Sequence, residues 1–264
     1  MSDTERKPTG RGPTDDAALA LLAAHEGALF LDFDGTLVDI APLPSQVIVP
    51  PALLAALGVL QLRLGGRLAV ISGRPIAELD SLLAPLVLPA AGVHGMERRG
   101  ADGVLRRLPP PDFTRVRAQA QELAARHPGL WVEEKHGALA LHCRQAPDLY
   151  DLCSAQLGAA VQEGAGLVLM EGKMIIEVKA AGVSKGTAIR DFLDEAPFRG
   201  HRPLFVGDDT TDEAGFDYVQ STDGIGLKVG PGPSAARCRI ASAEALRTAL
   251  AQVAATPTIG KDTR

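Results

Sequence analysis

Three short apolar runs recur along the chain, and each one stops abruptly at polar residues and glycine. They cover residues 28–36 (ALFLDFDGT), 67–74 (RLAVISGR) and 203–213 (PLFVGDDTTDE). Near-continuous apolar runs of this length are typical of strands that are buried on both faces of a parallel sheet. We therefore expect three parallel strands, each carrying a polar cluster at its carboxyl end.

Helical patterns separate these strands. Strands that alternate with helices indicate a doubly wound α/β domain, in which the active crevice lies outside the carboxyl ends of the strands. The polar clusters stand at that end in all three runs. The predicted helices cover residues 51–63, 76–83, 185–195 and 244–254.

The middle of the chain has a different pattern. Strands with short links between them, such as LWVEE and ALALHC, favour antiparallel pairing and therefore a separate α+β module inserted into the α/β core. The predicted core covers residues 15–97 and 183–254, and the inserted module covers 98–182. Polar ends at 1–14 and 255–264 are too poor in apolar residues to order themselves. Within the module we expect strands at 104–108, 130–134, 138–143, 167–171 and 174–179, and helices at 111–126 and 147–162.

Composition narrows the class of function. The net charge of -5 argues against a nucleic-acid partner, which would require a basic face. Three cysteines without a Cys-x-x-Cys pair fit a reducing compartment better than a disulfide framework. No apolar run is long enough to cross a membrane, and the first residues lack an apolar signal core. We expect a cytoplasmic monomer that acts on a small molecule, without a membrane partner.

The first polar cluster carries the strongest chemical signal. Side chains alternate along a strand, so Asp32 and Asp34 face the same way while Phe33 packs on the opposite side. Two neighbouring carboxylates repel each other unless they share a cation or a proton, and Mg²⁺ prefers carboxylate oxygens, water and phosphate. One carboxylate can then attack phosphorus while the other moves a proton. A turn with solvated acids is the simpler alternative.

The later clusters are weaker when each is taken alone. Ser72 can donate to a phosphoryl oxygen and Arg74 can hold an anion, although serine and glycine are also ordinary loop residues. Ser184 is expected to cap a helix whose first turn holds Lys185, a cation at a position that favours an anionic partner. Asp208, Asp209 and Asp212 form a second acidic group that suits a metal ion, or they cap the next helix.

In this order, the four clusters resemble the haloacid dehalogenase (HAD) superfamily, and all four motifs are intact. The resemblance implies a HAD-like doubly wound parallel sheet with an inserted α+β cap of the C2 type. It implies that Asp32 is the nucleophile and Asp34 the general acid/base, and that Ser72 and Lys185 stabilise the phosphoryl group. Mg²⁺ would be bound by Asp32, the Asp34 carbonyl and Asp208, with Asp209 or Asp212 in support.

Further segments resemble the trehalose-6-phosphate phosphatase family. They are HGME at 94–97, WVEEK at 131–135, ALHCR at 140–144, GKMIIEVK at 172–179 and FVGDDTTDEAGF at 205–216, with His136 standing where the family has glycine. The resemblance implies hydrolysis of trehalose 6-phosphate in trehalose biosynthesis. The residues expected to bind the substrate are Arg74, His94, Lys135, His142, Lys173 and Glu177. Period two places Lys173, Ile175, Glu177 and Lys179 on one face of a strand, a pattern that a solvated face also shows. His142 lies on an apolar strand and also fits a core histidine.

Three alternatives remain open from the residues alone. The same motifs serve a phosphatase for another sugar phosphate, such as sucrose phosphate, and a mutase that returns the phosphoryl group to a second hydroxyl. A regulatory protein that kept the fold without activity usually loses a motif acid, and this sequence has lost none.

Overall fold

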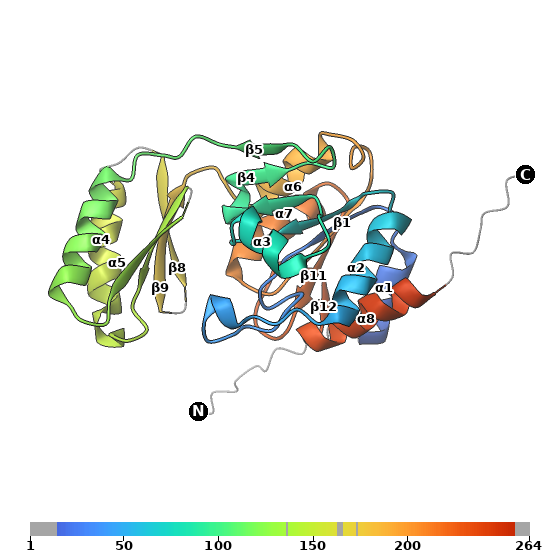
Figure 1. The fold of residues 1–264 in the computed structure, drawn as a ribbon, viewed down its shortest axis with the longest axis horizontal. Helices are drawn as coiled ribbons and strands as arrows, with labels where there is room; N and C mark the ends of the chain where they lie inside the picture. The colour runs from blue at the N-terminus through green and yellow to red at the C-terminus, as the bar shows by residue number, and fades with distance from the viewer. Residues whose placement is uncertain (1–14, 136, 163–165, 173, 257–264) are drawn as a thin grey trace, which may run out of the picture. The chain divides into compact units, whose positions relative to one another are not determined.

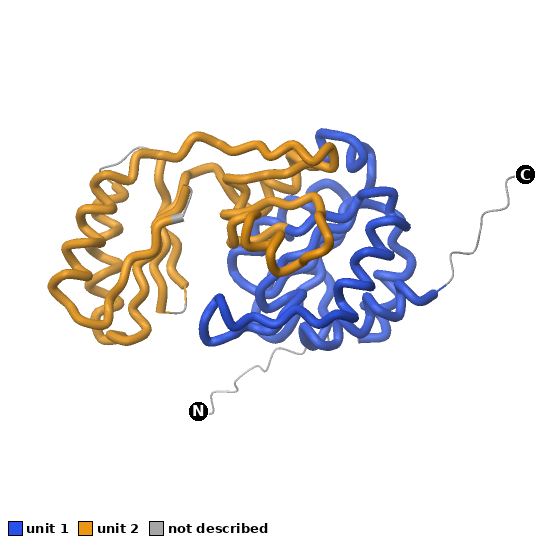
Figure 2. Tube along the Cα trace, viewed as in Figure 1, with its two compact units in different colours: residues 1–70, 193–264 blue, residues 71–192 orange. Residues whose placement is uncertain are grey.

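The computed structural model describes residues 15–135, 137–162, 166–172 and 174–256. The expected polar ends at 1–14 and 255–264 therefore lie almost wholly outside the described residues. The chain forms two compact units, residues 1–70 with 193–264, and residues 71–192 (Figure 2). The predicted inserted module, 98–182, lies within the second unit, and its exact boundaries stay a prediction.

The first unit contains a parallel sheet, as the apolar runs predicted (Figure 1). Every residue of β1, β2 and β10 is buried, so both faces of these strands are covered. β1 lies between β10 and β2, and all of the pairings are parallel. In spatial order the strands are β12 (Cys238–Ile240), β11 (Ile225–Val229), β10 (Pro203–Gly207), β1 (Ala28–Leu31) and β2 (Leu68–Ile71).

Helices cover the strands of this unit. α8 packs against both α1 and α2, whereas α7 packs against β10 and β11. The predicted helices at 51–63 and 244–254 are confirmed, and the first begins with Pro51, a residue that favours the first helical position. The sequence pattern did not identify α1, α7, β11 or β12. In β11, Gly226 and Lys228 interrupt the apolar run. The helices are α1 (Asp15–Ala24), α2 (Pro51–Arg63), α7 (Glu213–Ser221) and α8 (Ala243–Ala255).

The second unit begins with short elements around residues 71–107. Strands β3, β4 and β5 form an antiparallel ladder, and only the last of them was expected. The predicted helices at 76–83 and 185–195 are confirmed, the second ending two residues earlier than expected. The elements are α3 (Ile76–Leu83), β3 (Ala90–Gly92), β4 (Glu97–Arg99), β5 (Leu105–Arg107) and α6 (Lys185–Leu193).

A separate four-stranded sheet completes the second unit, in the order β6-β7-β9-β8. All three pairings are antiparallel, which confirms the prediction for LWVEE and ALALHC. Because directly opposed residues share a face, one side of this sheet carries the large apolar residues of β7 and β9. The elements are α4 (Thr114–Arg126), β6 (Trp131–Lys135), β7 (Ala138–His142), α5 (Tyr150–Gln162), β8 (Leu167–Gly172) and β9 (Ile175–Ala180).

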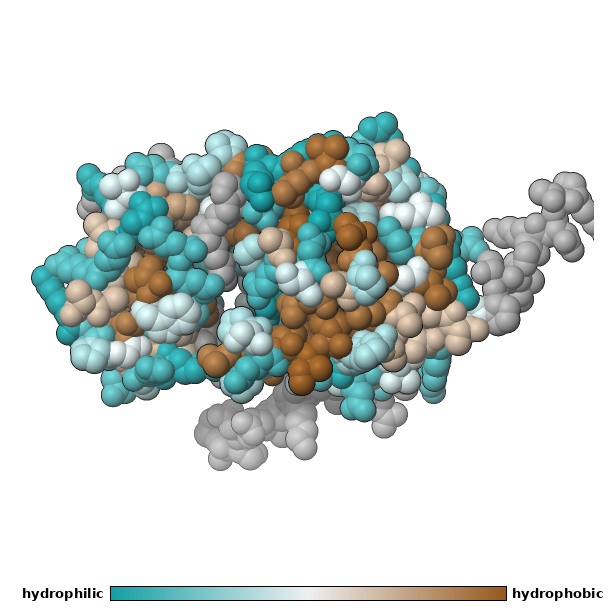
Figure 3. All heavy atoms as spheres, in the orientation of Figure 1, coloured by the Kyte–Doolittle hydropathy of each residue, from teal (hydrophilic) through white to brown (hydrophobic). Residues whose placement is uncertain are grey.

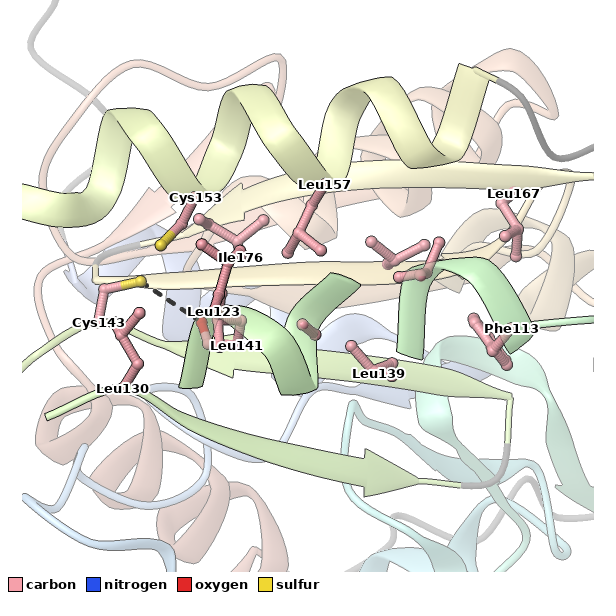
Figure 4. Packing of buried hydrophobic residues seen from close by; sticks show 13 residues of the cluster. Phe113, Leu123, Leu130, Leu139, Leu141, Cys143, Cys153, Leu157, Leu167 and Ile176 are labelled. Carbon is pink, nitrogen blue, oxygen red and sulfur yellow. Dashed lines mark hydrogen bonds between the residues drawn. The ribbon is translucent and has the colours of Figure 1, made fainter. Parts of the chain in front are cut away.

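Helices α4 and α5 cover that apolar side and form a core with it (Figure 4). Cys143 and Cys153 both lie in this core as free thiols, with their sulfur atoms turned toward each other. Burial raises the pKa of the Cys143 thiol to about 12 and also raises that of Cys153, so both stay protonated and unreactive. Figure 3 shows hydrophilic residues over the outer side of α4, as expected for an amphipathic helix.

Among the described residues, no helix is both long enough and apolar enough to cross a membrane.

The core between α5 and the four-stranded sheet predicts a large loss of stability for Leu157→Ala. Leu157 is fully buried, so the substitution removes apolar contacts and leaves a cavity, at a cost of about 2–5 kcal/mol in the free energy of unfolding. Leu152→Ala on the same helix is the control, because Leu152 is 42% exposed. Urea unfolding followed by circular dichroism measures both. Equal losses for the two variants would contradict the packing described here.

Candidate active site

Asp32 is the first residue after β1 and is almost completely buried. Its backbone N–H donates to the carbonyl of Val206 on the neighbouring strand β10, at 2.9 Å. This contact continues the parallel ladder by one residue, so Asp32 is positioned by the sheet and not by a loose loop. The predicted nucleophile thus occupies a rigid position at the carboxyl edge of the sheet.

A tight turn that includes Asp34 follows Asp32. The N–H groups of Leu37 and Val38 both donate to the carbonyl of Phe33, at 2.9 and 3.1 Å. Gly35 has a φ of +83°, and a Cβ there would lie 2.2 Å from the carboxylate of Asp208. Glycine is therefore required at this position for two reasons, the left-handed backbone and the close approach of the acid.

The acidic loop after β10 is fixed by its own hydrogen bonds. Asp212 is fully buried, and its Oδ2 accepts the N–H groups of Asp208 and Asp209, at 2.8 and 3.0 Å. The buried hydroxyl of Thr36 donates to Asp208 Oδ1 at 3.0 Å. These contacts join the turn after β1 to the loop after β10.

One carboxylate oxygen from each of Asp32, Asp208 and Asp212 lies within 4.8 Å of the others. Three carboxylates at this separation repel one another strongly unless a cation lies among them. A set made only of oxygen atoms suits Mg²⁺, Mn²⁺ or Ca²⁺. The residues present therefore fit a divalent metal ion.

Asp209, the other metal ligand expected from the sequence, lies outside this cluster. Its Oδ1 accepts the backbone N–H of Thr211 at 2.8 Å and its hydroxyl at 2.6 Å. It thereby caps the short helix that begins at Thr210, which is the simpler role considered for this motif. Asp212 occupies the cluster instead, and a metal contact from Asp209 stays a prediction.

Ser72 and Arg74 belong to the second unit and lie just after β2. Ser72 is buried, and its Oγ accepts the N–H of Arg74 at 3.1 Å. Arg74 forms an ion pair with Glu78 one helical turn later. The guanidinium is thus already partly neutralised, and its proposed contact with an anion is untested.

His94 occupies a strained turn between β3 and β4. Both Val93 and His94 have positive φ, at 47° and 55°, which is rare for residues with side chains and costly for the branched valine. His94 Nε2 lies 3.4 Å from Glu177 Oε2 on β9. Within the described residues, the buried Nδ1 of His94 has no hydrogen-bond partner. The structure therefore brings together two of the residues that the sequence assigned to the substrate.

Lys185 opens helix α6 and is almost completely buried. The predicted cap is confirmed, because Ser184 Oγ accepts the N–H of Thr187 at 3.1 Å. Nearby Lys179 is also buried and donates to the carbonyl of Val183 at 2.9 Å. Burial lowers the pKa of Lys179, Glu177 opposes this shift, and the charge of Lys185 adds to it.

His142 has a fuller set of protein partners than a substrate ligand needs. Its Nε2 lies 2.9 Å from Glu133 Oε2, and its ring stacks on Trp131 at 3.6 Å between centroids. It lies on the face of β7 opposite Leu139 and Leu141, outside the apolar core. His142 is therefore not a core histidine, and its contact with a substrate stays a prediction.

Two of the expected substrate residues cannot be placed in the same detail. Lys135 is the last residue of β6, and Lys173 lies outside the described residues. Lys228 was not expected from the sequence; it is a buried lysine on β11 that contacts the Asp208 loop. Its signal was a single lysine within the apolar segment IGLKV.

The fold is similar to that of a solved structure of the HAD superfamily. A phosphatase of this superfamily from Bacteroides thetaiotaomicron has a similar fold, with a TM-score of 0.60 and 16% identity over 95% of this chain and 99% of that chain. The C-terminal domain of Candida albicans trehalose-6-phosphate phosphatase is also similar, with a TM-score of 0.81 and 22% identity over 93% of this chain and 99% of that chain.

The chain belongs to the trehalose-phosphatase family. The model of that family matches residues 30–246. The trehalose-6-phosphate phosphatase of Escherichia coli (strain K12) is 43% identical over 216 residues, which cover 81% of each chain. The resemblance inferred from the sequence motifs is confirmed.

The contact between Gly35 and Asp208 predicts that Gly35→Ala disables the enzyme. The added Cβ must displace the Asp208 carboxylate, and misplacement by about 1 Å can cost 10²-fold in activity. Gly103→Ala is the matched control, because Gly103 has a similar φ of +75° but open space around it. Steady-state turnover measures the difference. Equal activity in the two variants would contradict the geometry described for the acidic cluster.

Proposed function

We propose that this chain hydrolyses trehalose 6-phosphate to trehalose and inorganic phosphate. The observation that carries the proposal is the cluster of Asp32, Asp208 and Asp212 at neighbouring strand ends, in a chain of the trehalose-phosphatase family. The Escherichia coli relative is named for the same substrate. The cytoplasmic location and the monomeric state expected from the sequence stay predictions.

The metal ion is proposed to be Mg²⁺. Asp32, Asp208 and Asp212 would hold it through carboxylate oxygens, and Asp34 through its backbone carbonyl. When bound, Mg²⁺ offsets the negative charge of these acids and of the substrate phosphate. The oxygen-only donor set and the close approach of the three carboxylates support this assignment.

Asp32 is the proposed nucleophile. One of its carboxylate oxygens attacks phosphorus and forms an aspartyl phosphate, while the bond from phosphorus to the sugar oxygen breaks. Asp34 gives its proton to that departing oxygen, so that trehalose leaves as a neutral alcohol. The fixed position of Asp32 at the end of β1 supports this role, because a nucleophile must be held in line with phosphorus.

Water completes the reaction. Asp34, now a carboxylate, removes a proton from a water molecule while the oxygen of that water attacks phosphorus. The bond between phosphorus and Asp32 breaks, which releases inorganic phosphate and restores both acids. Asp34 is half-buried, which is consistent with a residue that exchanges protons with water.

Ser72, Lys185 and Arg74 are proposed to stabilise the phosphoryl group. Ser72 would donate through its hydroxyl and Lys185 through its ammonium group, which suit an oxygen atom that gains negative charge. The match to the superfamily motifs supports these roles.

The four-stranded sheet is proposed to bind the disaccharide. Its face opposite the apolar core carries Trp131, Glu133, His142, Glu177 and Lys179, which are mostly polar. Carboxylates and ammonium groups pair well with sugar hydroxyls. Lys135, Lys173 and Glu177 remain our candidates for direct contacts, whereas His142 would act by holding Glu133. A phosphatase for sucrose phosphate is not favoured by the relatives found.

The covalent mechanism predicts that Asp32→Asn abolishes turnover and leaves the fold intact, because an amide does not attack phosphorus. Asp34→Asn should lose about 10²- to 10⁴-fold, the usual contribution of a positioned acid or base. Phosphate release measures turnover, and circular dichroism checks the fold. A folded Asp32→Asn protein with wild-type activity would exclude Asp32 as the nucleophile.

The substrate assignment is tested by phosphate release from trehalose 6-phosphate, sucrose 6-phosphate, glucose 6-phosphate and a small aryl phosphate. A site built for sugar hydroxyls can reject a substrate lacking them by roughly 10⁴- to 10⁵-fold. We expect trehalose 6-phosphate to have by far the highest kcat/KM. Comparable values for sucrose 6-phosphate would refute the assignment.

Glu177→Ala tests the sugar-binding face in the same assay. It should lower kcat/KM for trehalose 6-phosphate strongly and leave hydrolysis of the aryl phosphate unchanged. Glu171→Ala is the control, since Glu171 lies on the same sheet but pairs with Ile176, on the helix-covered side. A loss shared equally by both substrates would show that Glu177 has a structural role only.

A further inference from the structure

Lys228 is a buried lysine to which the catalytic cycle gives no task. It lies in β11 with only 4% of its surface exposed, between the buried residues Leu227 and Val229. Lysine is almost never buried to this extent unless its charge is paired. Its position therefore requires a physical reason.

The ammonium group of Lys228 reaches the acidic loop after β10. Nζ donates to the backbone carbonyl of Asp208 and, at 2.8 Å, to that of Val229. The pairing of β10 with β11 sets this approach, because Gly207 lies directly opposite Lys228. The N–H of Asp208 donates to Asp212 Oδ2 on the other side. The backbone of Asp208 is thus held at both its N–H and its carbonyl.

This double hold fixes the direction in which the Asp208 carboxylate points. The N–H and the carbonyl of Asp208 belong to the two peptide groups on either side of its Cα, so the two hydrogen bonds together restrain its φ and ψ and, with them, the direction of its Cα–Cβ bond. With Lys228 and Asp212 in place, Asp208 Oδ1 meets the Thr36 hydroxyl at 3.0 Å and the carboxylate joins the cluster with Asp32.

The positive charge of Lys228, taken alone, would disfavour the binding of a metal ion to the neighbouring acids. Burial lowers its pKa, the carboxylates of Asp208, Asp212 and Glu213 oppose that shift, and Arg239 adds to it. A cation beside a metal site repels the metal, so the charge by itself would weaken binding. The contribution to metal binding must therefore come from the position that Lys228 imposes on the loop.

We propose that Lys228 is a positioning residue that holds the loop from Asp208 to Asp212 in its metal-binding conformation. The proposal rests on the metal site of the proposed function. Residues that orient metal ligands typically contribute about 10- to 100-fold to metal affinity. If Lys228 acts by position, its loss weakens metal binding; if it acts only through its charge, its loss strengthens metal binding. The direction of the change in affinity therefore separates the two explanations.

The test measures the binding of Mn²⁺ to the full chain. The electron paramagnetic resonance signal of free Mn²⁺ reports how much of the ion remains unbound. Mn²⁺ takes the same oxygen ligands as Mg²⁺ and can be detected directly. Lys228→Met should raise the dissociation constant about 10- to 100-fold. Its KM for substrate should stay near the wild-type value at saturating metal. Thermal unfolding in a chelator checks that the variant folds.

Arg239→Met is the matched control. Arg239 lies opposite Lys228 on β12 and also donates to backbone carbonyls, but to those of Gly230 and Gly232. It removes the same charge from the same neighbourhood without touching Asp208, so its Mn²⁺ affinity should stay at the wild-type value. Lys228→Gln, which keeps an N–H donor group on a shorter, uncharged side chain, should give an intermediate loss, and it decides the question if Lys228→Met does not fold.

Weaker Mn²⁺ binding in the Lys228 variants, with unchanged binding in Arg239→Met, supports the proposal. Unchanged or tighter binding in the Lys228 variants overturns it, and so does an equal loss in Arg239→Met. If the wild-type chain itself binds no Mn²⁺, the metal site of the proposed function fails, and the role of Lys228 fails with it.

Discussion

Strands β1 and β10 run parallel and in register, from Ala28 opposite Pro203 to Leu31 opposite Val206. Both strands therefore end at the same edge of the sheet, and the next residues along the chain, Asp32 and the Asp208 loop, must lie close together. The pairing of the two strands therefore places Asp32 and the Asp208 loop at this edge together. The remaining features of the acidic site are consequences of this pairing, because the surrounding residues must accommodate several carboxylates in a small space.

The chain accommodates these acids by giving each a different set of partners. Asp212 accepts two backbone N–H groups, Asp208 accepts the Thr36 hydroxyl, and Asp209 turns away to cap the following helix. Gly35 leaves the room that Asp208 occupies. Each acid is thereby held at a fixed place, and the mutual repulsion of the closely spaced carboxylates is relieved when a cation lies among them.

The two faces of the four-stranded sheet differ in character. Leu139 and Leu141 point into the core beneath α4 and α5, whereas the alternate residues leave a polar surface. Because the side-chain period of a strand is two, polar substitutions on one face leave the packing of the other untouched. A sheet of this kind can change the residues of its polar face without losing its core, whereas the acidic cluster of the first unit has no such freedom.

The sequence by itself determined the class of fold, the order of the main elements and the chemistry of the four motifs. Apolar runs such as ALFL are fixed by burial on both faces, and the acids that follow them are visible without coordinates. The tertiary structure decided which acids meet. Asp209 and Asp212 are the same type of residue in the same motif. Only the hydrogen bonds of the folded loop place Asp212 in the cluster and make Asp209 a helix cap. It also decided the contacts of His142, whose partners Trp131 and Glu133 lie on another strand, and those of Lys228, whose ammonium group donates to backbone carbonyls. Contacts of these kinds depend on strand register and on backbone groups that every residue has, so the pattern of residues in the sequence does not predict them.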